Sequence, residues 1–302
     1  MKKMKNIKLL VTSFLMLSIA MLVSSCSPET YALDAPTNKS DIHFEITQDL
    51  VADPGGNTVI LKNTTPGVIL TWDYVTGKSN KGTQIVKYAF KGDYTIKVSA
   101  VTGGGIVELD PVTITVSDNN LNYVNDPLWT ALSGGVGVGK SKTWYLDLNA
   151  DGVSKFFVGP VAFSGNKLGW QKECTGDAGL CWIWEPDWKG NQWITPAGDY
   201  GSMTFSLDGG PFVTVNHALT TTRGIEHGTY FLDATKHELT LTNAAILQSA
   251  SAAADVSDWS NYKIISLTED TMQIAAFNKS KAEFIIFNFI SKEYSDNWVP
   301  KD

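Results

Sequence analysis

The sequence predicts an all-β protein, and three observations indicate this class. Short runs of alternating apolar and polar residues recur along the 302-residue chain. Gly, Asn and Asp punctuate these runs, as they do between the strands of antiparallel sandwiches. The first half of the chain beyond the N-terminal leader shows no convincing apolar spacing of an amphipathic helix. Without its leader the chain is still long enough for two domains, so we expect two successive β-domains.

The N-terminal 26 residues form a basic and then apolar leader. Four lysines precede the apolar run 9–23, which is too short and too interrupted to span a bilayer. The run ends in VSSC, which resembles a bacterial lipobox with Cys26 as the lipidated residue. We therefore expect residues 1–25 to be removed as a signal peptide and residues 26–35 to form a linker. The lipid would anchor the protein to a membrane that the chain does not span.

The mature chain is strongly acidic. Residues 1–25 contain four lysines and no acid, so their removal changes the net charge from −7 to −11. A body of this charge repels nucleic acid, whose phosphate backbone needs cationic contacts. A neutral ligand or another protein suits this charge better, and we expect no nucleic-acid partner.

Residues 36–117 form the first expected domain. Its expected strands are 68–70, 85–90, 94–101 and 112–117. The segment from Trp72-Asp73-Tyr74 to the pattern Gly92-x-Tyr94-x-Ile96-x-Val98 resembles a PKD domain, an immunoglobulin-like sandwich. The resemblance implies that this domain is a spacer and that Trp72 belongs to its core.

Residues 118–302 form the second expected domain, which begins in the polar stretch SDNNLN at 117–122. Its expected strands are 142–148, 154–159, 202–207, 211–215, 228–233, 237–242, 262–267, 272–277 and 282–290. Nine strands with turn residues between them predict a jelly-roll-like β-sandwich. A lipocalin-like barrel is the alternative topology.

The longest stretch without an expected strand, 160–201, contains four tryptophans among polar and turn-forming residues. Long loops of this kind tend to be functional. A sugar ring stacks its C–H faces on flat aromatic rings, and its hydroxyls bond to carboxylates and amides. We therefore expect a glycan site whose platforms are Trp182, Trp184, Trp188 and Trp193. The expected hydrogen-bonding residues are Glu185, Asp187 and Asn191, and we expect at least one of the four tryptophans to be core.

Two cysteines remain once Cys26 carries lipid. An oxidising compartment outside the cytoplasm favours a disulfide between Cys174 and Cys181. This bridge would staple the start of the tryptophan segment.

No cofactor, metal site or catalytic centre is expected. The segment GGVGVGKS at 134–141 fits a phosphate-binding loop in letters, but a strand follows it where that loop needs a helix. The histidines are too widely spaced for a compact zinc motif. Glu185 and Asp187 could be a glycoside hydrolase pair, so an enzyme is one alternative function. A protein-binding surface module is the other.

Several segments and the domain order together resemble one family. The segments 142–152, 198–210, 228–247 and 268–300, with a lipidated N-terminus and a PKD spacer, are similar to surface glycan-binding lipoproteins of Bacteroides-type polysaccharide uptake systems. The resemblance covers nearly the whole mature chain. It implies a non-catalytic lipoprotein on the outer face of the outer membrane that binds a polysaccharide, with a laminarin-type β-glucan named first. The implied partners are a barrel transporter and its lid lipoprotein.

Overall fold

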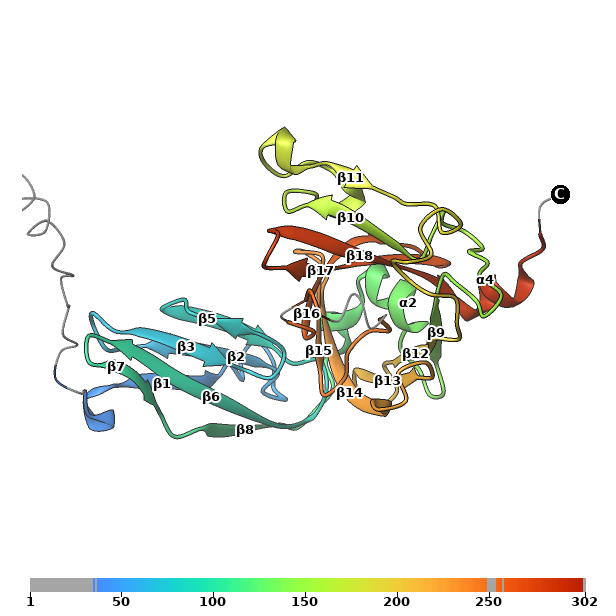
Figure 1. Cartoon of the computed structure of the whole chain (residues 1–302). Helices are drawn as coiled ribbons and strands as arrows, with labels where there is room; N and C mark the ends of the chain where they lie inside the picture. Colours follow the sequence, from blue (N-terminus) through green and yellow to red (C-terminus); the bar gives the residue numbers. More distant parts are fainter. Residues whose placement is uncertain (1–34, 36, 249–253, 257, 301–302) are drawn as a thin grey trace, which may run out of the picture.

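A computed structural model describes residues 35, 37–248, 254–256 and 258–300. The leader, Cys26 and nearly all of the expected linker 26–35 lie outside these residues. The described chain is dominated by strands, which confirms the all-β class, and it forms two bodies (Figure 1). Within this part of the chain, no helix has the length and apolar character needed to cross a membrane.

The first body consists of two antiparallel sheets around one core. One sheet contains, in spatial order, β1 (Phe44–Gln48), β2 (Thr58–Asn63) and β5 (Thr83–Lys87), and a short 3-10 turn, η1 (Lys39–Asp41), precedes it. The other contains β4 (Lys78–Ser79), β3 (Ile69–Asp73), β6 (Gly92–Thr102) and β7 (Gly105–Glu108), with β8 (Val112–Val116) paired to β6. Trp72 is fully buried in this core, as expected, and its Nε1 donates to the carbonyl of Lys81 at 2.9 Å.

A short helix, α2 (Pro127–Ser133), follows the 3-10 turn η2 (Leu121–Val124) and packs into the second body. The Asp126 side chain accepts from the N–H of Leu128 at 2.8 Å, and Pro occupies the first helical position, where its missing N–H costs nothing. Gly134 ends the helix in a left-handed conformation with φ of 80°. Sequence analysis did not anticipate this helix.

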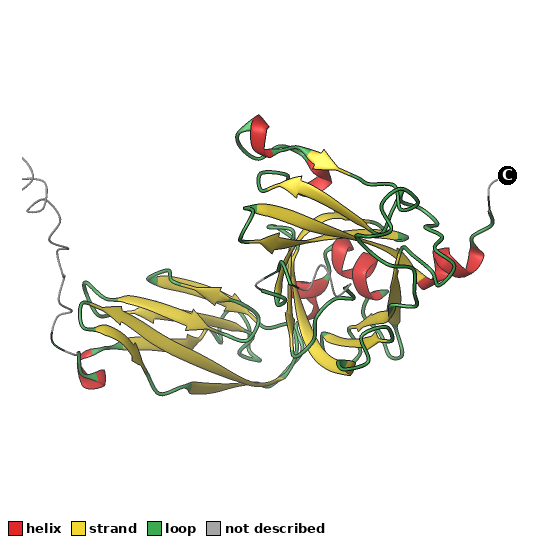
Figure 2. Ribbon diagram, viewed as in Figure 1, coloured by secondary structure: helices red, strands yellow, loops and turns green. Residues whose placement is uncertain are grey.

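The second body is a closed barrel of eight antiparallel strands (Figure 2). Their order around the barrel is β9 (Ser141–Leu146), β12 (Gly201–Ser206), β13 (Phe212–His217), β14 (Gly224–Asp233), β15 (Glu238–Thr242), β16 (Asn261–Leu267), β17 (Thr271–Asn278) and β18 (Glu283–Ser291). Pairing of β18 with β9 closes the ring. Apolar side chains fill its interior, and α2 contributes Trp129 and Leu132 to that core.

The expectation of a jelly-roll-like sandwich was therefore wrong, and the closed barrel of the alternative is the observed architecture. From β12 to β18, each strand pairs with the next strand in sequence, so the crossing connections of a jelly roll are absent from this part of the chain. The last strand then returns to the first and leaves the barrel no open edge. Alternating apolar residues turn one face of each strand toward the core in a sandwich and in a barrel alike. The alternation therefore does not identify the neighbours of a strand in the sheet.

Strand β18 has two partners along one edge. Its second half pairs with β9, and its first half pairs with β10 (Val161–Gly165). A two-residue strand, β11 (Ile183–Trp184), adds to the far side of β10. The β10–β11 hairpin therefore extends the barrel wall past the end of β9 (Figure 1).

The expected strand at 154–159 was also wrong, and a buried carboxylate explains why. Asp147 is fully buried, and its two oxygens accept from the backbone N–H groups of Lys155 at 2.7 Å, Phe156 at 3.0 Å and Phe157 at 2.7 Å. These donors are satisfied by a side chain, so the segment curls around it and does not join a sheet. Burial nevertheless raises the pKa of the Asp147 carboxyl above its usual value.

We predict that Asp147→Ala destabilises the barrel strongly. Three backbone donors would lose their buried acceptor, which should lower the free energy of unfolding by about 3 kcal/mol. Asp151→Ala is the matched control, because Asp151 lies exposed in the same connection. Urea denaturation of both variants would measure the effect. A stability of Asp147→Ala within about 0.5 kcal/mol of the control, the usual range of surface substitutions, would show that the carboxylate does not organise the segment.

Candidate functional site

The β10–β11 hairpin holds the start of the tryptophan segment. Both strands lie inside the stretch 160–201, where no strand was expected, and the connection between them contains η3 (Trp170–Lys172) and η4 (Ala178–Leu180). Cys174 and Cys181 are disulfide-bonded, with Cα atoms 5.4 Å apart. The backbone N–H of Gly165 donates to the carbonyl of Trp182 at 3.0 Å, which continues the hydrogen-bond ladder between β10 and β11. The bridge and the ladder together fix the chain that enters β11.

Alternation along β11 places Trp182 and Trp184 on one face of the hairpin. Ile183, between them, points to the opposite face and packs against a small core that includes Ile286 of β18. Trp184 stacks on Phe163 of β10, with ring centroids 5.3 Å apart and planes 25° from parallel. The two tryptophans are 42% and 45% exposed, so each ring keeps a free surface.

These rings line a cleft of about 280 Å³ next to the barrel core. Val161 of β10 and Ile285 of β18 line the cleft and also belong to the barrel core. The loop that follows β11 returns to the same place and contributes Trp193, Ile194 and Thr195. Trp193 is 74% exposed, the most of the three cleft tryptophans. The result is a cleft, the aromatic cleft, whose floor is apolar and whose sides are indole rings.

Four polar side chains also line the aromatic cleft: Thr195, Asp255, Lys281 and Glu283. Lys281 Nζ lies 3.8 Å from Glu283 Oε1, a weak ion pair at the start of β18. The hydroxyl of Thr195 is buried and has no hydrogen-bond partner within the described chain. A buried hydroxyl without a partner costs free energy, which a ligand hydroxyl in the cleft could recover. Sequence reasoning missed these residues, and Asp255, Lys281 and Glu283 lie far along the chain from the tryptophans.

Trp188 does not line the aromatic cleft, but it holds a residue that does. Its ring packs against the barrel core, and its Nε1 donates to the carbonyl of Thr195 at 2.8 Å. The backbone N–H of Trp188 donates to the carbonyl of Val158 at 3.0 Å. The indole also fills the space beside Gly152, where an added Cβ would come within 2.2 Å of the ring. Among the four tryptophans, Trp188 therefore comes nearest to the core residue that we expected, although its ring is only half-buried.

The three polar residues expected at the sugar hydroxyls lie outside the cleft lining. Glu185 forms an ion pair with Lys172 of η3, with Nζ and Oε1 2.7 Å apart. Asp187 accepts from the N–H of Gly190 at 2.8 Å, and its carbonyl accepts from the Asn191 side chain at 3.0 Å. Both of these bonds close a turn. Across the described residues, no group of three or more His, Cys, Asp or Glu side chains is placed to hold a metal ion.

We predict that two tryptophan substitutions lower the stability to very different extents. Trp188→Ala removes a ring packed on the core and should lower the free energy of unfolding by about 3–5 kcal/mol. Trp193→Ala removes a ring that is mostly in solvent and should change it by less than about 1 kcal/mol. Thermal and urea denaturation of the two proteins would measure the difference. Equal losses in both would contradict the distinction between a supporting and a lining tryptophan.

No protein-family model matches this chain, and no curated protein matches it either. The indication of function therefore comes from the chemistry of the aromatic cleft. Three exposed indoles, a buried hydroxyl without a partner and a few charged groups surround one apolar floor. Such a surface suits a ligand with apolar faces and polar edges.

Proposed function

We propose that this protein is a non-catalytic glycan-binding lipoprotein whose aromatic cleft holds the sugar. The observation that carries the proposal is the grouping of Trp182, Trp184 and Trp193 around one cleft, each with an exposed ring surface. Three indoles gathered at one place form an apolar patch of the kind that marks binding sites on soluble domains. Indole faces also give large contact area with little loss of side-chain entropy.

The polar lining fits a neutral sugar. Asp255 and Glu283 would accept hydrogen bonds from sugar hydroxyls, Lys281 would donate one, and Thr195 could do either. These groups sum to one net negative charge, which would repel a uronic acid and leave a neutral ring unaffected. A laminarin-type β-glucan is the ligand that the family resemblance implies, and a lining that disfavours acidic sugars supports this choice of a neutral glycan.

The remaining parts of the chain fit the same role. We propose that lipid on Cys26 anchors the protein to the outer face of the outer membrane. Residues 36–117 would be a PKD-like spacer, and residues 118–302 would be the domain that binds glycan. The resemblance implies a barrel transporter and its lid lipoprotein as neighbours. The two-sheet body supports the spacer role, because its tryptophan, Trp72, is buried in its own core.

A glycoside hydrolase is the second candidate, and one observation favours it. Asp255 and Glu283 line the same cleft, and two carboxylates beside a sugar are what glycoside hydrolysis uses. In that case Glu283→Gln would abolish the formation of new reducing ends. In a binding protein it would weaken affinity only.

We predict that the mature protein binds laminarin and releases no product from it. Affinity electrophoresis against a panel that includes laminarin, a neutral α-glucan and an alginate would measure binding, and a reducing-end assay would detect cleavage. Binding should change little between low and high salt, since no ion pair forms with a neutral sugar. New reducing ends would identify an enzyme, and the absence of binding to every neutral glycan would contradict the proposal.

Single substitutions in the cleft should separate affinity from stability. Trp182→Ala, Trp184→Ala or Trp193→Ala should each weaken laminarin binding by about 2 kcal/mol, roughly thirtyfold, if the ring is a stacking platform. Asp187→Ala is the matched control, because Asp187 lies in the same segment but outside the cleft lining. Isothermal titration of each folded variant would measure the change. Unchanged affinity in all three would place the site elsewhere.

A further inference from the structure

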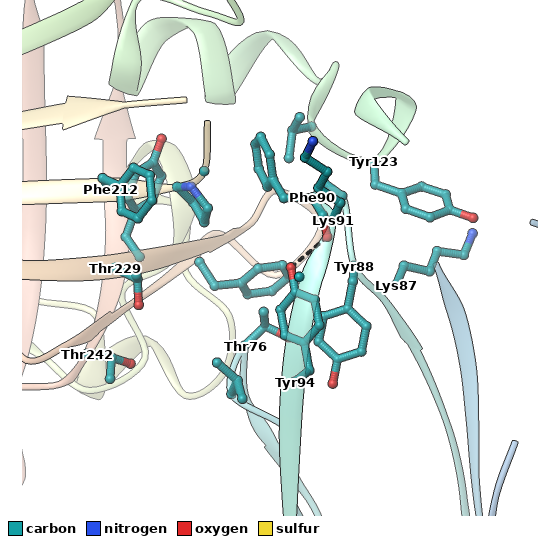
Figure 3. A pocket seen from close by; sticks show the side chains of 18 of the residues that line it. Thr76, Lys87, Tyr88, Phe90, Lys91, Tyr94, Tyr123, Phe212, Thr229 and Thr242 are labelled. Carbon is teal, nitrogen blue, oxygen red and sulfur yellow. Dashed lines mark hydrogen bonds between the residues drawn. The ribbon is translucent and has the colours of Figure 1, made fainter. Parts of the chain in front are cut away.

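A second cavity lies between the two bodies, and it belongs to neither alone. It encloses about 230 Å³, and the first body lines it with Thr76, Tyr88, Phe90, Lys91 and Tyr94 (Figure 3). The outer face of the barrel lines the other side with Phe212, Thr229 and Thr242 (Figure 3). We propose that this interdomain cleft is a second binding site that takes a single neutral sugar ring, a claim that rests on the proposed glycan-binding function.

The barrel wall of the interdomain cleft presents one ring and two hydroxyls in a row. Phe212 of β13 pairs in register with Thr229 of β14, and Thr229 pairs with Thr242 of β15. Residues paired in this way share one face of a sheet and lie side by side. Phe212 is 49% exposed, so its ring is available for contact. This wall therefore combines an aromatic face with hydrogen-bonding groups, as the aromatic cleft does.

The wall from the first body adds a rigid aromatic pair. Tyr88 and Tyr94 stack with ring centroids 3.8 Å apart. The Tyr94 hydroxyl donates to the carbonyl of Phe90 at 2.8 Å, which fixes the ring beside the cleft (Figure 3). Lys87, Lys91 and Asp93 line the cleft as well, and their charges sum to one net positive charge. This charge would repel a cationic ligand and leave a neutral sugar ring unaffected. The interdomain cleft is smaller than the aromatic cleft and lies between two walls, so a single ring is the ligand that suits its size.

Hydrogen bonds of the connecting segment hold the two walls in place. The carboxylate of Asp53 accepts from Thr58, Tyr123 and Asn120. These bonds lower the pKa of the carboxyl, with the largest effect from Thr58. The side chain of Asn57 donates to the carbonyls of Tyr88 and Asp118, each at 2.8 Å. The start of the second body is thereby tied to the first.

Apolar packing joins the two bodies at the same place. Phe90 is only 6% exposed, and it belongs to the same core cluster as Val124 and Trp129 of the second body. A cleft whose walls are fixed before binding loses little entropy when it takes a ligand. The interdomain cleft is therefore preformed.

A strained residue stands at the rim of the interdomain cleft. Val75 has φ of 72°, a left-handed conformation that a β-branched side chain rarely adopts. Its side chain is 43% exposed and lines the cleft. Strain of this kind tends to gather at functional sites, which agrees with a binding role for the cleft.

The test compares full mature proteins that carry one blocked site each. Thr242→Trp fills the interdomain cleft without removing a core side chain, and Phe212→Ala removes its exposed ring. Ile225→Trp is the control, because Ile225 is 61% exposed on the same barrel strand as Thr229 and lies outside the cleft lining. Trp184→Ala disables the aromatic cleft. Titration calorimetry with the β-1,3-linked glucose hexasaccharide and with glucose would give the number of sites and the affinity of each.

We expect two sites in the wild type and in Ile225→Trp. Thr242→Trp and Phe212→Ala should each weaken the affinity of the interdomain cleft at least tenfold. Trp184→Ala should weaken the affinity of the aromatic cleft to the same extent. A single site that only Trp184→Ala removes would overturn the interdomain site and leave the proposed function intact. A single site that only Thr242→Trp and Phe212→Ala remove would support the interdomain site and reject the aromatic cleft. No binding of either sugar by the wild type would overturn both.

Discussion

Strand β18 shares one hydrogen-bonded edge between two partners, and the rest of the structure depends on this sharing. Its second half pairs with β9 and closes the barrel, while its first half pairs with β10 and carries the tryptophan hairpin. One continuous strand face therefore passes from the buried barrel core at Phe287 and Phe289 to the aromatic cleft at Glu283. If β9 extended farther along β18, it would displace β10, and the hairpin would have no edge to join.

This arrangement lets the protein keep large rings in solvent on a rigid support. The free surface of Trp184 is fixed from behind by Phe163, and its backbone is fixed by the pairing of β11 with β10. Trp188 and the disulfide hold the two ends of the same segment. Preorganised rings lose little entropy when a ligand covers them, so binding can use most of the gain from apolar contact. The interdomain cleft is also fixed before binding, because the hydrogen bonds of Asp53 hold its walls in place.

Local patterns in the sequence predicted the class, most strands and the burial of Trp72, because alternation and turn residues act over a few neighbouring positions. They did not predict which edges pair, so the barrel closure stayed an alternative. The expected strand at 154–159 did not form because the Asp147 carboxylate accepts hydrogen bonds from backbone N–H groups eight to ten positions away. The helix α2 did carry a readable signal in Asp126-Pro127 and Gly134. The cleft carboxylates of Asp255 and Glu283 carried none, because only the closed fold brings them to the tryptophans.

The central claim is that glycan lies on the indole rings of the aromatic cleft. Hydroxyl-radical footprinting of the mature protein tests it most directly, with oxidation measured at each tryptophan by mass spectrometry in the presence and absence of laminarin. The account predicts that laminarin reduces oxidation of Trp182, Trp184 and Trp193 several-fold and leaves the buried Trp72 unchanged. Unchanged oxidation of all three cleft tryptophans in protein saturated with laminarin would contradict it.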